Sequence, residues 1–240
     1  VGSDFPFKWE VVRYSKAFLH KYWSSSRFAS QFLHGHSPAL KGSERLRTLD
    51  YWILGRLAET VQAVTEALDG YQFHVALELL QNFLWHDLCD QYLEAVKHRL
   101  YSPEDPEELE AARYTLSLAL SSFTLMLTPF CPHITDEVYH NLFDSSIPTV
   151  HGLAWPKLDS IPINDMRKEE GKLLIEAISL IRSEKSKAGI SLSAPLQRII
   201  LQGPSKSLAI VRKEEGDVKS ILKIREIAYE AGEALAAKIG

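Results

Sequence analysis

The sequence predicts a mainly α-helical protein, in which a helical bundle is followed by a small α/β module. Apolar residues recur at spacings of three and four through most of residues 9–142, which is the period of one helical face. Residues 145–162 are rich in proline and have no helical period. Beyond them, helical patterns alternate with short β-branched runs, as in small α/β units. We therefore expect a bundle at residues 1–147, a linker at 148–164 and an α/β domain at 165–240.

The first two helices are predicted from their apolar stripes and their end signals. The first spans Trp9–Leu33, where Phe18 and Tyr22 belong to one apolar face. The second is expected to begin after Ser43, because serine is a good N-cap residue. It is expected to end at Asp69, which a glycine follows.

Two further helices complete the main part of the predicted bundle. The third runs from about Tyr71 to Arg99 and is apolar around more than half its circumference, so it is expected to be central. Pro103 and Pro106 break the chain. The acidic residues that follow suit the first turn of a fourth helix, because the helix dipole favours carboxylates there. Long helices joined by short links form a bundle.

The α/β module is predicted from the segments that follow the linker. A helix at Asp165–Ala188 precedes a β-branched strand at Arg198–Leu201. A second helix is expected from Ser205 and a second strand near Ile224–Tyr229. The last residues of the chain are expected to form a short helix.

The composition excludes several classes of protein. Two cysteines are too few for a disulfide framework, which indicates a reducing, cytoplasmic setting. Tyr114–Thr135 carries no charge, but its hydroxyl side chains share one helical face, so we expect a bundle helix and no membrane span. The chain starts without methionine and without a secretory leader, so we interpret it as a fragment of a longer polypeptide.

Charge is distributed unevenly along the chain. Residues 1–60 carry nine Lys and Arg against five Asp and Glu, a balance of +4, while residues 61–159 carry four against fifteen, a balance of −11. Residues 160–240 carry fourteen against eleven, a balance of +3. Basic ends around an acidic middle indicate that a polyanion is bound by particular faces only.

The first helix carries a one-sided row of cationic and polar side chains. At about 100° per residue the row falls within an arc of about 80°. It consists of Arg13, Lys16, His20, Ser24, Arg27 and Gln31, with Trp23 and Phe28 beside it. Cations bind phosphates electrostatically and an aromatic ring can stack on an unpaired base, which is how single-stranded RNA loops are recognised. The alternative is that the cations are only solvated and that both aromatic rings belong to the core.

Residues 127–143, LTPFCPHITDEVYHNLF, concentrate residue types that metal and acid–base sites use. The candidate ligands are His133, Glu137 and His140, with His86 and Cys89 from the third helix. We favour a structural junction, in which one helix ends at the prolines and Thr135 caps the next, with carboxylates in its first turn. In that arrangement His133 precedes the helix, Cys89 is a buried thiol, and no metal is bound.

Five motifs follow one another along the chain. They are RYSKAFLHKYWSSSRF, DYWILGRLAETVQAVTEALDGYQFHVALELLQNFLWHDLCDQYLEAVK, LTPFCPHITDEVY, VHGLAWP and IRSEKSKAGISLSAPL. Together they resemble the anticodon-binding helical domain of class I aminoacyl-tRNA synthetases, in the subgroup that handles valine, isoleucine and leucine. The last motif is most similar to valyl-tRNA synthetases of archaeal type. The resemblance covers residues 5–200 well.

The resemblance implies a fold, a partner and a set of site residues. The fold is the anticodon-binding helical bundle of class I synthetases, followed by the small α/β module. The partner is tRNA(Val), bound chiefly through its anticodon arm. The tRNA-binding candidates are Arg13, Lys16, His20, Trp23, Arg27, Phe28, Gln31, Arg182 and Lys185. The parent polypeptide would be a cytoplasmic, monomeric valine–tRNA ligase whose catalytic domain uses ATP and magnesium.

The chain departs from the family pattern in several places. The family has asparagine in WNASRF where this chain has Ser24 in WSSSRF, so a tRNA contact or cap made by that asparagine would be weakened here. No C-terminal coiled-coil arm like that of bacterial valyl enzymes is expected. Signatures resembling His-Ile-Gly-His and Lys-Met-Ser-Lys-Ser, with which class I synthetases activate amino acids, do not occur. We therefore expect this fragment to recognise tRNA, to hold no cofactor and to form no aminoacyl-adenylate.

Three alternatives stay open from the sequence. Isoleucyl-tRNA synthetase is the nearest, because specificity for the amino acid is set in a domain that the chain lacks. A helical metal-dependent enzyme centred on His133, Glu137 and His140 would bind stoichiometric zinc or iron. A protein-interaction bundle would have no affinity for tRNA.

Overall fold

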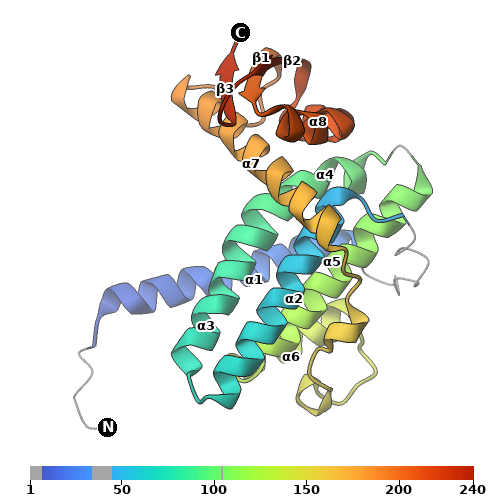
Figure 1. The fold of residues 1–240 in the computed structure, drawn as a ribbon. Helices are drawn as coiled ribbons and strands as arrows, with labels where there is room; N and C mark the ends of the chain where they lie inside the picture. Colours follow the sequence, from blue (N-terminus) through green and yellow to red (C-terminus); the bar gives the residue numbers. More distant parts are fainter. Residues whose placement is uncertain (1–6, 34–44, 104) are drawn as a thin grey trace.

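The computed structural model describes residues 7–33, 45–103 and 105–240. It shows a bundle of long helices with a small module that contains a sheet packed at one end (Figure 1). The bundle comprises α1 (Trp9–Leu33), α2 (Thr48–Asp69), α3 (Phe73–Asn82), α4 (Glu94–Tyr101), α5 (Pro106–Leu127) and α6 (Pro132–Leu142). This arrangement confirms the predicted fold class.

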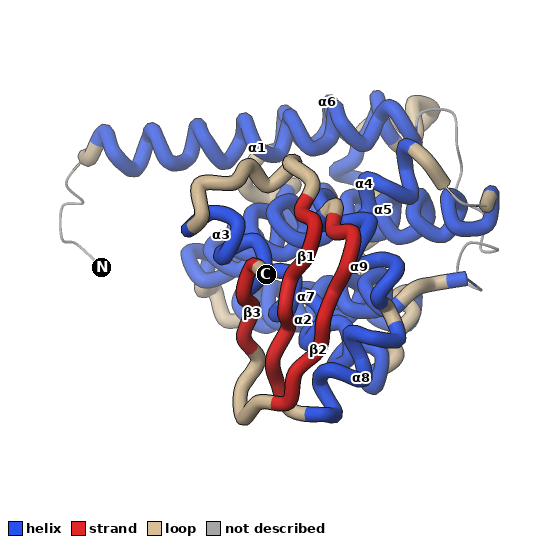
Figure 2. Tube along the Cα trace, turned by 90° about the horizontal axis from the view of Figure 1, so that it is seen from above, coloured by secondary structure: helices blue, strands red, loops and turns tan. Residues whose placement is uncertain are grey.

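Helix α1 spans Trp9–Leu33, as its apolar spacing predicts. Its C-terminal half is packed, with Phe18, Tyr22 and Ala29 buried in the bundle core. The N-terminal part, residues 7–17, is exposed throughout and extends beyond the bundle (Figure 1, Figure 2). The helix is therefore anchored at one end, and the face that carries the cationic row is open to solvent.

Helix α2 begins at Thr48, later than a cap at Ser43 predicts, and Ser43 itself lies outside the described residues. Arg47 occupies the N-cap, and its backbone N–H donates to Asp50 Oδ2 at 2.8 Å. A carboxylate three residues into the helix thus satisfies an N–H that would otherwise lack a partner, which fixes where the helix starts. The predicted end at Asp69 is confirmed.

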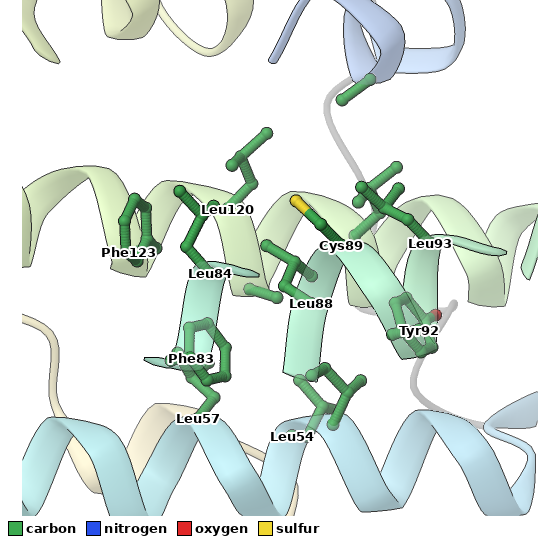
Figure 3. Close-up of a cluster of buried hydrophobic side chains, with 14 of the residues drawn as sticks. Leu54, Leu57, Phe83, Leu84, Leu88, Cys89, Tyr92, Leu93, Leu120 and Phe123 are labelled. Atoms are coloured by element: carbon green, nitrogen blue, oxygen red, sulfur yellow. The ribbon is translucent and has the colours of Figure 1, made fainter. Parts of the chain in front are cut away.

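The third predicted helix is central, as expected, but it is not a regular α-helix. An 11-residue π-helical segment, η2 (Phe83–Leu93), joins α3 to α4. Its side chains Leu84 and Leu88 lie between α2 and α5 in the core (Figure 3). Cys89 is buried beside them, as predicted, and burial raises the pKa of its thiol to about 11. A π-helix changes the rotation per residue, and the apolar pattern of the sequence carries no signal for it.

Helix α5 starts where the acidic turn predicts. Pro106 is its first residue, and Asp105 is the N-cap, whose side chain accepts a hydrogen bond of 2.9 Å from the backbone of Glu108. The uncharged stretch of α5 is packed inside the bundle, and several of its hydroxyl side chains form hydrogen bonds there. Thr124, for example, shares a hydrogen bond of 2.9 Å with the hydroxyl of Tyr22. Over the described ranges, none of the helices combines the length and the apolar character that a bilayer crossing requires.

The predicted start of the next helix is wrong. Helix α6 begins at Pro132, and Cys131 occupies the N-cap. Thr135 lies inside the helix, where its hydroxyl donates to the Cys131 carbonyl at 2.9 Å. Proline suits the first helical position because the N–H that it lacks would have no partner there. Asp136 and Glu137 consequently lie beyond the first turn.

Residues 145–162 form the predicted irregular connection. Two short 3₁₀ turns lie within it, η3 (Val150–Gly152) and η4 (Leu158–Ser160). The connection is fastened to the bundle, since Trp155 Nε1 donates to Thr65 Oγ1 of α2 at 2.9 Å and Ile161 is buried in the bundle core. The division of the chain into parts that fold independently stays a prediction.

The C-terminal module consists of helices and a three-stranded sheet (Figure 1, Figure 2). Its elements are α7 (Asp165–Lys187), β1 (Leu196–Gly203), α8 (Ser205–Lys213), α9 (Glu215–Leu222), β2 (Ile224–Ala231) and β3 (Ala236–Ile239). The strand order is β2-β1-β3, with β2 parallel and β3 antiparallel to β1. The predicted order of helix, strand, helix and strand is confirmed up to β2.

The predicted final short helix is wrong. Residues Ala236–Ile239 form β3, in which Ala237 lies opposite Leu201 of the central strand. The edge of β1 offers backbone N–H and C=O groups that need partners. Pairing with that edge stabilises the extended form of a segment whose alanines favour a helix locally.

Helix α7 docks the module on α2. Gly171 lies so close to α2 that an added Cβ would be 2.5 Å from Trp52 Cβ, so a larger residue does not fit there without a shift. Arg47, at the start of α2, forms ion pairs with both Asp217 of α9 and Glu108 of α5. The module is therefore held to the bundle by the close packing of α7 on α2 and by the ion pairs of Arg47, which join α2, α5 and α9.

Candidate nucleic-acid interface

The cationic row of α1 is exposed, and its strongest charges are unpaired. Arg13, Lys16 and Arg27 have no carboxylate partner among the residues that the structure describes. By contrast, every described Lys and Arg from residue 45 to residue 142 pairs with an Asp or a Glu. An exposed cation that has no carboxylate partner in the protein can pair with an anionic group of a ligand without first breaking an ion pair. The row is therefore suited to bind phosphates.

The first part of the row lines a groove between α1 and η2, which we call the η2 groove. Its volume is about 460 Å³, and its lining residues are Arg13, Lys16, Ala17, His20, Lys21, Ser24 and Trp85. The indole of Trp85 stacks on Tyr14, with ring centroids 5.9 Å apart and planes at 5°. Lys21 Nζ lies 5.7 Å from the centre of the same indole. The η2 groove thus combines phosphate-binding cations with an aromatic wall.

The second part of the row lines a smaller groove between α1 and α6, which we call the α6 groove. Its volume is about 230 Å³, and its lining residues are Trp23, Ser26, Arg27, Ser30, Glu137, Val138, Asn141 and Leu142. Val138 and Leu142 are buried and give the groove an apolar floor. Trp23 is 42% exposed, so part of its indole is open to a ligand. A groove lined by a partly exposed aromatic ring and by apolar side chains suits a planar ring, and Arg27 suits an attached phosphate.

Two members of the predicted set on α1 lie outside both grooves. Gln31 is exposed near the end of α1. Phe28 is half-buried and packs on Phe32 and Tyr101, with ring centroids 5.3 Å and 6.2 Å away. Lys97 Nζ lies 5.8 Å from the centre of the Phe28 ring. Phe28 thus already packs inside the protein, and its stacking on an RNA base stays a prediction.

Phe28→Ala is expected to lower the free energy of unfolding by about 1–3 kcal/mol, less than the loss of a fully buried ring, because only part of the ring is packed. Urea denaturation measures this change, with Phe73→Ala on an exposed ring of α3 as the control. A loss no larger than that of the control would contradict the packing role. If Phe28 also stacks on a base, the folded variant will lose affinity for an RNA with an intact loop but not for one with an altered loop.

The structure corrects the expectation for Lys185. Its side chain is fully buried, and its ammonium group donates to the backbone carbonyls of Leu192, Ala194 and Leu222 at 3.0, 2.6 and 3.1 Å. Burial lowers the pKa of Lys185 below its ordinary value, and the charge of Lys223 acts in the same direction. Lys185 holds the end of α7 to the loop before β1 and to α9, so it is not available to an RNA phosphate.

Arg182 is directed toward the bundle. Its guanidinium donates to the Asp90 carbonyl at 3.0 Å and to Gln91 Oε1 at 3.2 Å, both on η2. Burial lowers the pKa of Arg182, against the opposing effect of the Glu94 and Asp90 carboxylates. Arg182 therefore joins α7 to η2, and its contact with RNA stays a prediction.

The candidate metal ligands of α6 do not converge. His133 and Glu137 are exposed on α6, so the argument that His133 precedes the helix is wrong. The ring nitrogens of His140 are engaged elsewhere, 3.0 Å from the Asp136 carbonyl and 2.6 Å from the Ile147 carbonyl. In the described part of the chain, no three His, Cys, Asp or Glu side chains are grouped so that they could hold a metal ion. The absence of a bound metal stays a prediction.

The free energy of unfolding is expected to depend on the protonation of His140. Two carbonyl groups can both accept from the ring only when both nitrogens carry protons, so these contacts raise the pKa of His140 above its ordinary value of 6.5. The stabilisation is complete below pH 6.5, the pKa of the unfolded chain, and is lost as the pH rises through the higher folded pKa. Urea denaturation at several pH values measures it. His140→Gln should flatten the dependence, and a slope that this variant leaves unchanged would refute the idea, with His133→Gln as the control.

Several groove residues are not predicted from the sequence as part of the site, among them four with cationic, aromatic or polar side chains, Lys21, Trp85, Glu137 and Asn141. Lys21 lies off the arc of the cationic row, but its long side chain reaches the Trp85 ring. Trp85 belongs to η2, and Glu137 and Asn141 belong to α6. A helical projection of α1 does not show which residues of other elements lie beside it. The available signal is the density of polar residues on α6, which draws attention to this helix but does not indicate that it packs beside α1.

Known proteins resemble the chain over nearly its whole length. Residues 50–200 match the family described as the anticodon-binding domain of tRNA ligase. The valine–tRNA ligase of Methanothermobacter thermautotrophicus is 38% identical over 96% of this chain and 25% of the relative, and that of Thermococcus kodakarensis is 36% identical over 97% and 26%. The valine–tRNA ligase of Sulfurisphaera tokodaii is 33% identical over 100% of this chain, including α1, and 28% of the relative. The chain spans about a quarter of the length of the curated relatives that it matches.

Proposed function

The chain belongs to the family of anticodon-binding domains of tRNA ligases, and on this premise we propose that it binds the anticodon arm of tRNA(Val) as part of a valine–tRNA ligase. The names of its relatives support the choice of amino acid. Because the chain spans about a quarter of those relatives, the ligase activity would lie in the remainder of the polypeptide.

The unpaired cationic row of α1 is the observation that carries the proposal. Arg13 and Lys16 in the η2 groove and Arg27 in the α6 groove can each neutralise a phosphate without breaking an ion pair among the described residues. Trp85 and Trp23 offer aromatic faces on which bases can stack. Anticodon bases are unpaired in the loop of a free tRNA, so a surface with both features suits an anticodon arm better than a duplex.

The proposed mechanism is positional. The buried half of α1 fixes the helix to the bundle, so RNA bound on α1 would have a defined orientation relative to the rest of the polypeptide. Holding the anticodon end in this way would place the acceptor end of the tRNA in the catalytic domain. ATP and magnesium would act in that domain. We propose that the polypeptide is a monomer, and its two free cysteines are in keeping with a place in the reducing cytoplasm.

Competition binding tests the proposal. Labelled tRNA(Val) is first bound to the chain, and unlabelled tRNA(Val), tRNA(Ile) or the tRNA of an unrelated amino acid is then added as the competitor. The fraction of label that each competitor displaces is measured at several salt concentrations. We expect tRNA(Val) to compete best, and the logarithm of the binding constant to fall linearly with the logarithm of the salt concentration. A preference for tRNA(Ile) would favour an isoleucyl enzyme. No salt-dependent binding of any tRNA would exclude RNA recognition by this chain.

A further inference from the structure

A small polar cavity lies where the bundle meets the C-terminal module. Its volume is about 10 Å³. The residues that line it come from α2, η2, α4 and α9 and are Leu49, Tyr92, Ala95, Val96, His98, Arg99 and Asp217. A single water molecule needs roughly 10–15 Å³ of such space. The cavity therefore has the size of one water molecule and is too small for an organic ligand.

Two buried polar atoms of residues that line this cavity, Arg99 Nε and His98 Nε2, have no hydrogen-bond partner within the described ranges. Arg99 is only 3% exposed. Its other nitrogens are occupied, since Nη1 donates to Asp50 Oδ1 at 2.9 Å and Nη2 to the Glu108 carbonyl at 3.3 Å. A buried donor without an acceptor destabilises the folded state, so folded proteins pair nearly all such groups with protein atoms or with water. The Nε–H of Arg99 therefore needs an acceptor in the cavity.

His98 and Asp217 present acceptors to each other. His98 Nδ1 lies 2.8 Å from the Ala95 carbonyl, which can only accept, so Nδ1 carries a proton and Nε2 of the neutral ring is an acceptor. Burial acts to raise the pKa of Asp217, but the neighbouring His98 and Arg47 outweigh it and hold that pKa below its usual range. Asp217 is therefore a carboxylate. Its Oδ1 lies 3.6 Å from His98 Nε2, too far for a hydrogen bond.

We propose that one water molecule binds in this cavity and links α4 of the bundle to α9 of the module. A water molecule has two O–H donors and can also accept. It would donate to His98 Nε2 and to the Asp217 carboxylate, and it would accept from Arg99 Nε. These needs match the water molecule group by group, and polar groups more than 3.5 Å apart are often bridged in this way. The inference does not depend on the binding of RNA.

The bound water would add a second attachment to the direct contacts between bundle and module. Arg47 pairs with Asp217, and Thr48 Oγ1 donates to Glu214 Oε1 at 2.6 Å, so both of these contacts come from the start of α2. The water would instead attach α9 to α4. His98 would then be a positioning residue, which acts on α9 through the water.

The competing arrangement needs no water. If the ring of His98 were an imidazolium, Nε2 would carry a proton and would donate to Asp217 directly after a small shift of the ring. Arg99 Nε would then still lack an acceptor. The two arrangements differ in the proton on His98 Nε2 and in the presence of an ordered water, and both differences can be measured.

Two substitutions of His98 test the acceptor at Nε2. His98→Phe keeps a flat ring but removes the acceptor, and we expect the melting temperature to fall by roughly 2–10 °C. His98→Gln places an amide group near the position of Nε2 and should recover most of this loss. Both variants lose the contact with the Ala95 carbonyl, so the difference between them isolates the acceptor. His86→Phe, on the exposed surface of η2, is the control and should change the melting temperature little.

A high-resolution crystal structure of the whole chain at neutral pH tests the water directly, together with the ¹⁵N NMR spectrum of its histidines. We expect an ordered water about 2.7–3.2 Å from Arg99 Nε, His98 Nε2 and the Asp217 carboxylate, and an unprotonated Nε2 in the spectrum of His98. An empty cavity, or an imidazolium at His98 in direct contact with Asp217, would overturn the inference. Equal losses of stability in His98→Phe and His98→Gln, or a loss no larger than that of His86→Phe, would overturn it as well.

Discussion

Asp50→Ala is expected to lower the free energy of unfolding by about 3–5 kcal/mol, because it leaves a buried positive charge without its partner. Asp50 is fully buried, and its Oδ1 accepts hydrogen bonds from Arg99 Nη1 at 2.9 Å and from the Tyr92 hydroxyl at 2.7 Å. Its other oxygen accepts from the backbone of Arg47 at 2.8 Å. One carboxylate thus joins the start of α2 to η2 and α4, and Arg99 is itself buried.

Urea denaturation of the whole chain measures this loss. Glu59→Ala is the matched control, because Glu59 is also a carboxylate of α2 that forms ion pairs, with Arg56 and Lys168, but on the surface. Its loss is expected to be at most about 1 kcal/mol. Adding Arg99→Met to Asp50→Ala should recover part of the stability, since the unpaired charge is then removed as well. Equal losses for Asp50→Ala and Glu59→Ala would contradict this account of the buried pair.

Removing the three unpaired cations of α1 together, as Arg13→Ala, Lys16→Ala and Arg27→Ala, is expected to weaken tRNA binding on the order of 100-fold at physiological salt. Each phosphate contact contributes about 0.7–0.9 to the slope of log K against log salt, so the slope should decrease by roughly 2–3. Stability should hardly change, because the three side chains are exposed. Fluorescence anisotropy with labelled tRNA(Val), at several salt concentrations, measures both quantities.

A second triple variant controls for net charge. Lys172→Ala, Lys206→Ala and Lys238→Ala remove the same charge from exposed positions of the C-terminal module. Because these positions lie outside both grooves, we expect a much smaller loss of affinity and little change in the salt slope. Equal losses in the two triple variants would show that binding follows the total charge of the protein and not the surface of α1.

Elements whose signals lie within their own segment could be predicted from the sequence. The apolar stripes of α1 and α7 and the acidic first turn of α5 identify these helices locally. The start of α6 could not be predicted in the same way, because Pro132 and Thr135 both satisfy the rules for a helix start. The final strand β3 depends on the free edge of β1, which is distant in sequence, while its own alanines indicate a helix.

The cationic face of α1 could be predicted from the sequence, but the two grooves that this face lines could not. The cationic row lies on one helix, so the helical period is sufficient to find it. The second walls of the grooves come from η2 and α6, and their positions depend on packing. Lys185 illustrates the opposite error, because a lysine within a basic motif resembles a phosphate ligand until the fold buries it among three carbonyl groups.

Binding of isolated tRNA arms tests the central claim most directly, namely that α1 and its two grooves bind the anticodon arm of tRNA(Val). The measurement compares the affinity of the chain for two hairpins of equal length, the anticodon arm and the acceptor arm of tRNA(Val), at one salt concentration. We predict that the anticodon hairpin retains most of the affinity of the whole tRNA. The acceptor hairpin should bind roughly 10-fold more weakly or worse, since one stacked base alone contributes about 1–3 kcal/mol. Equal affinity for the two hairpins would contradict the account.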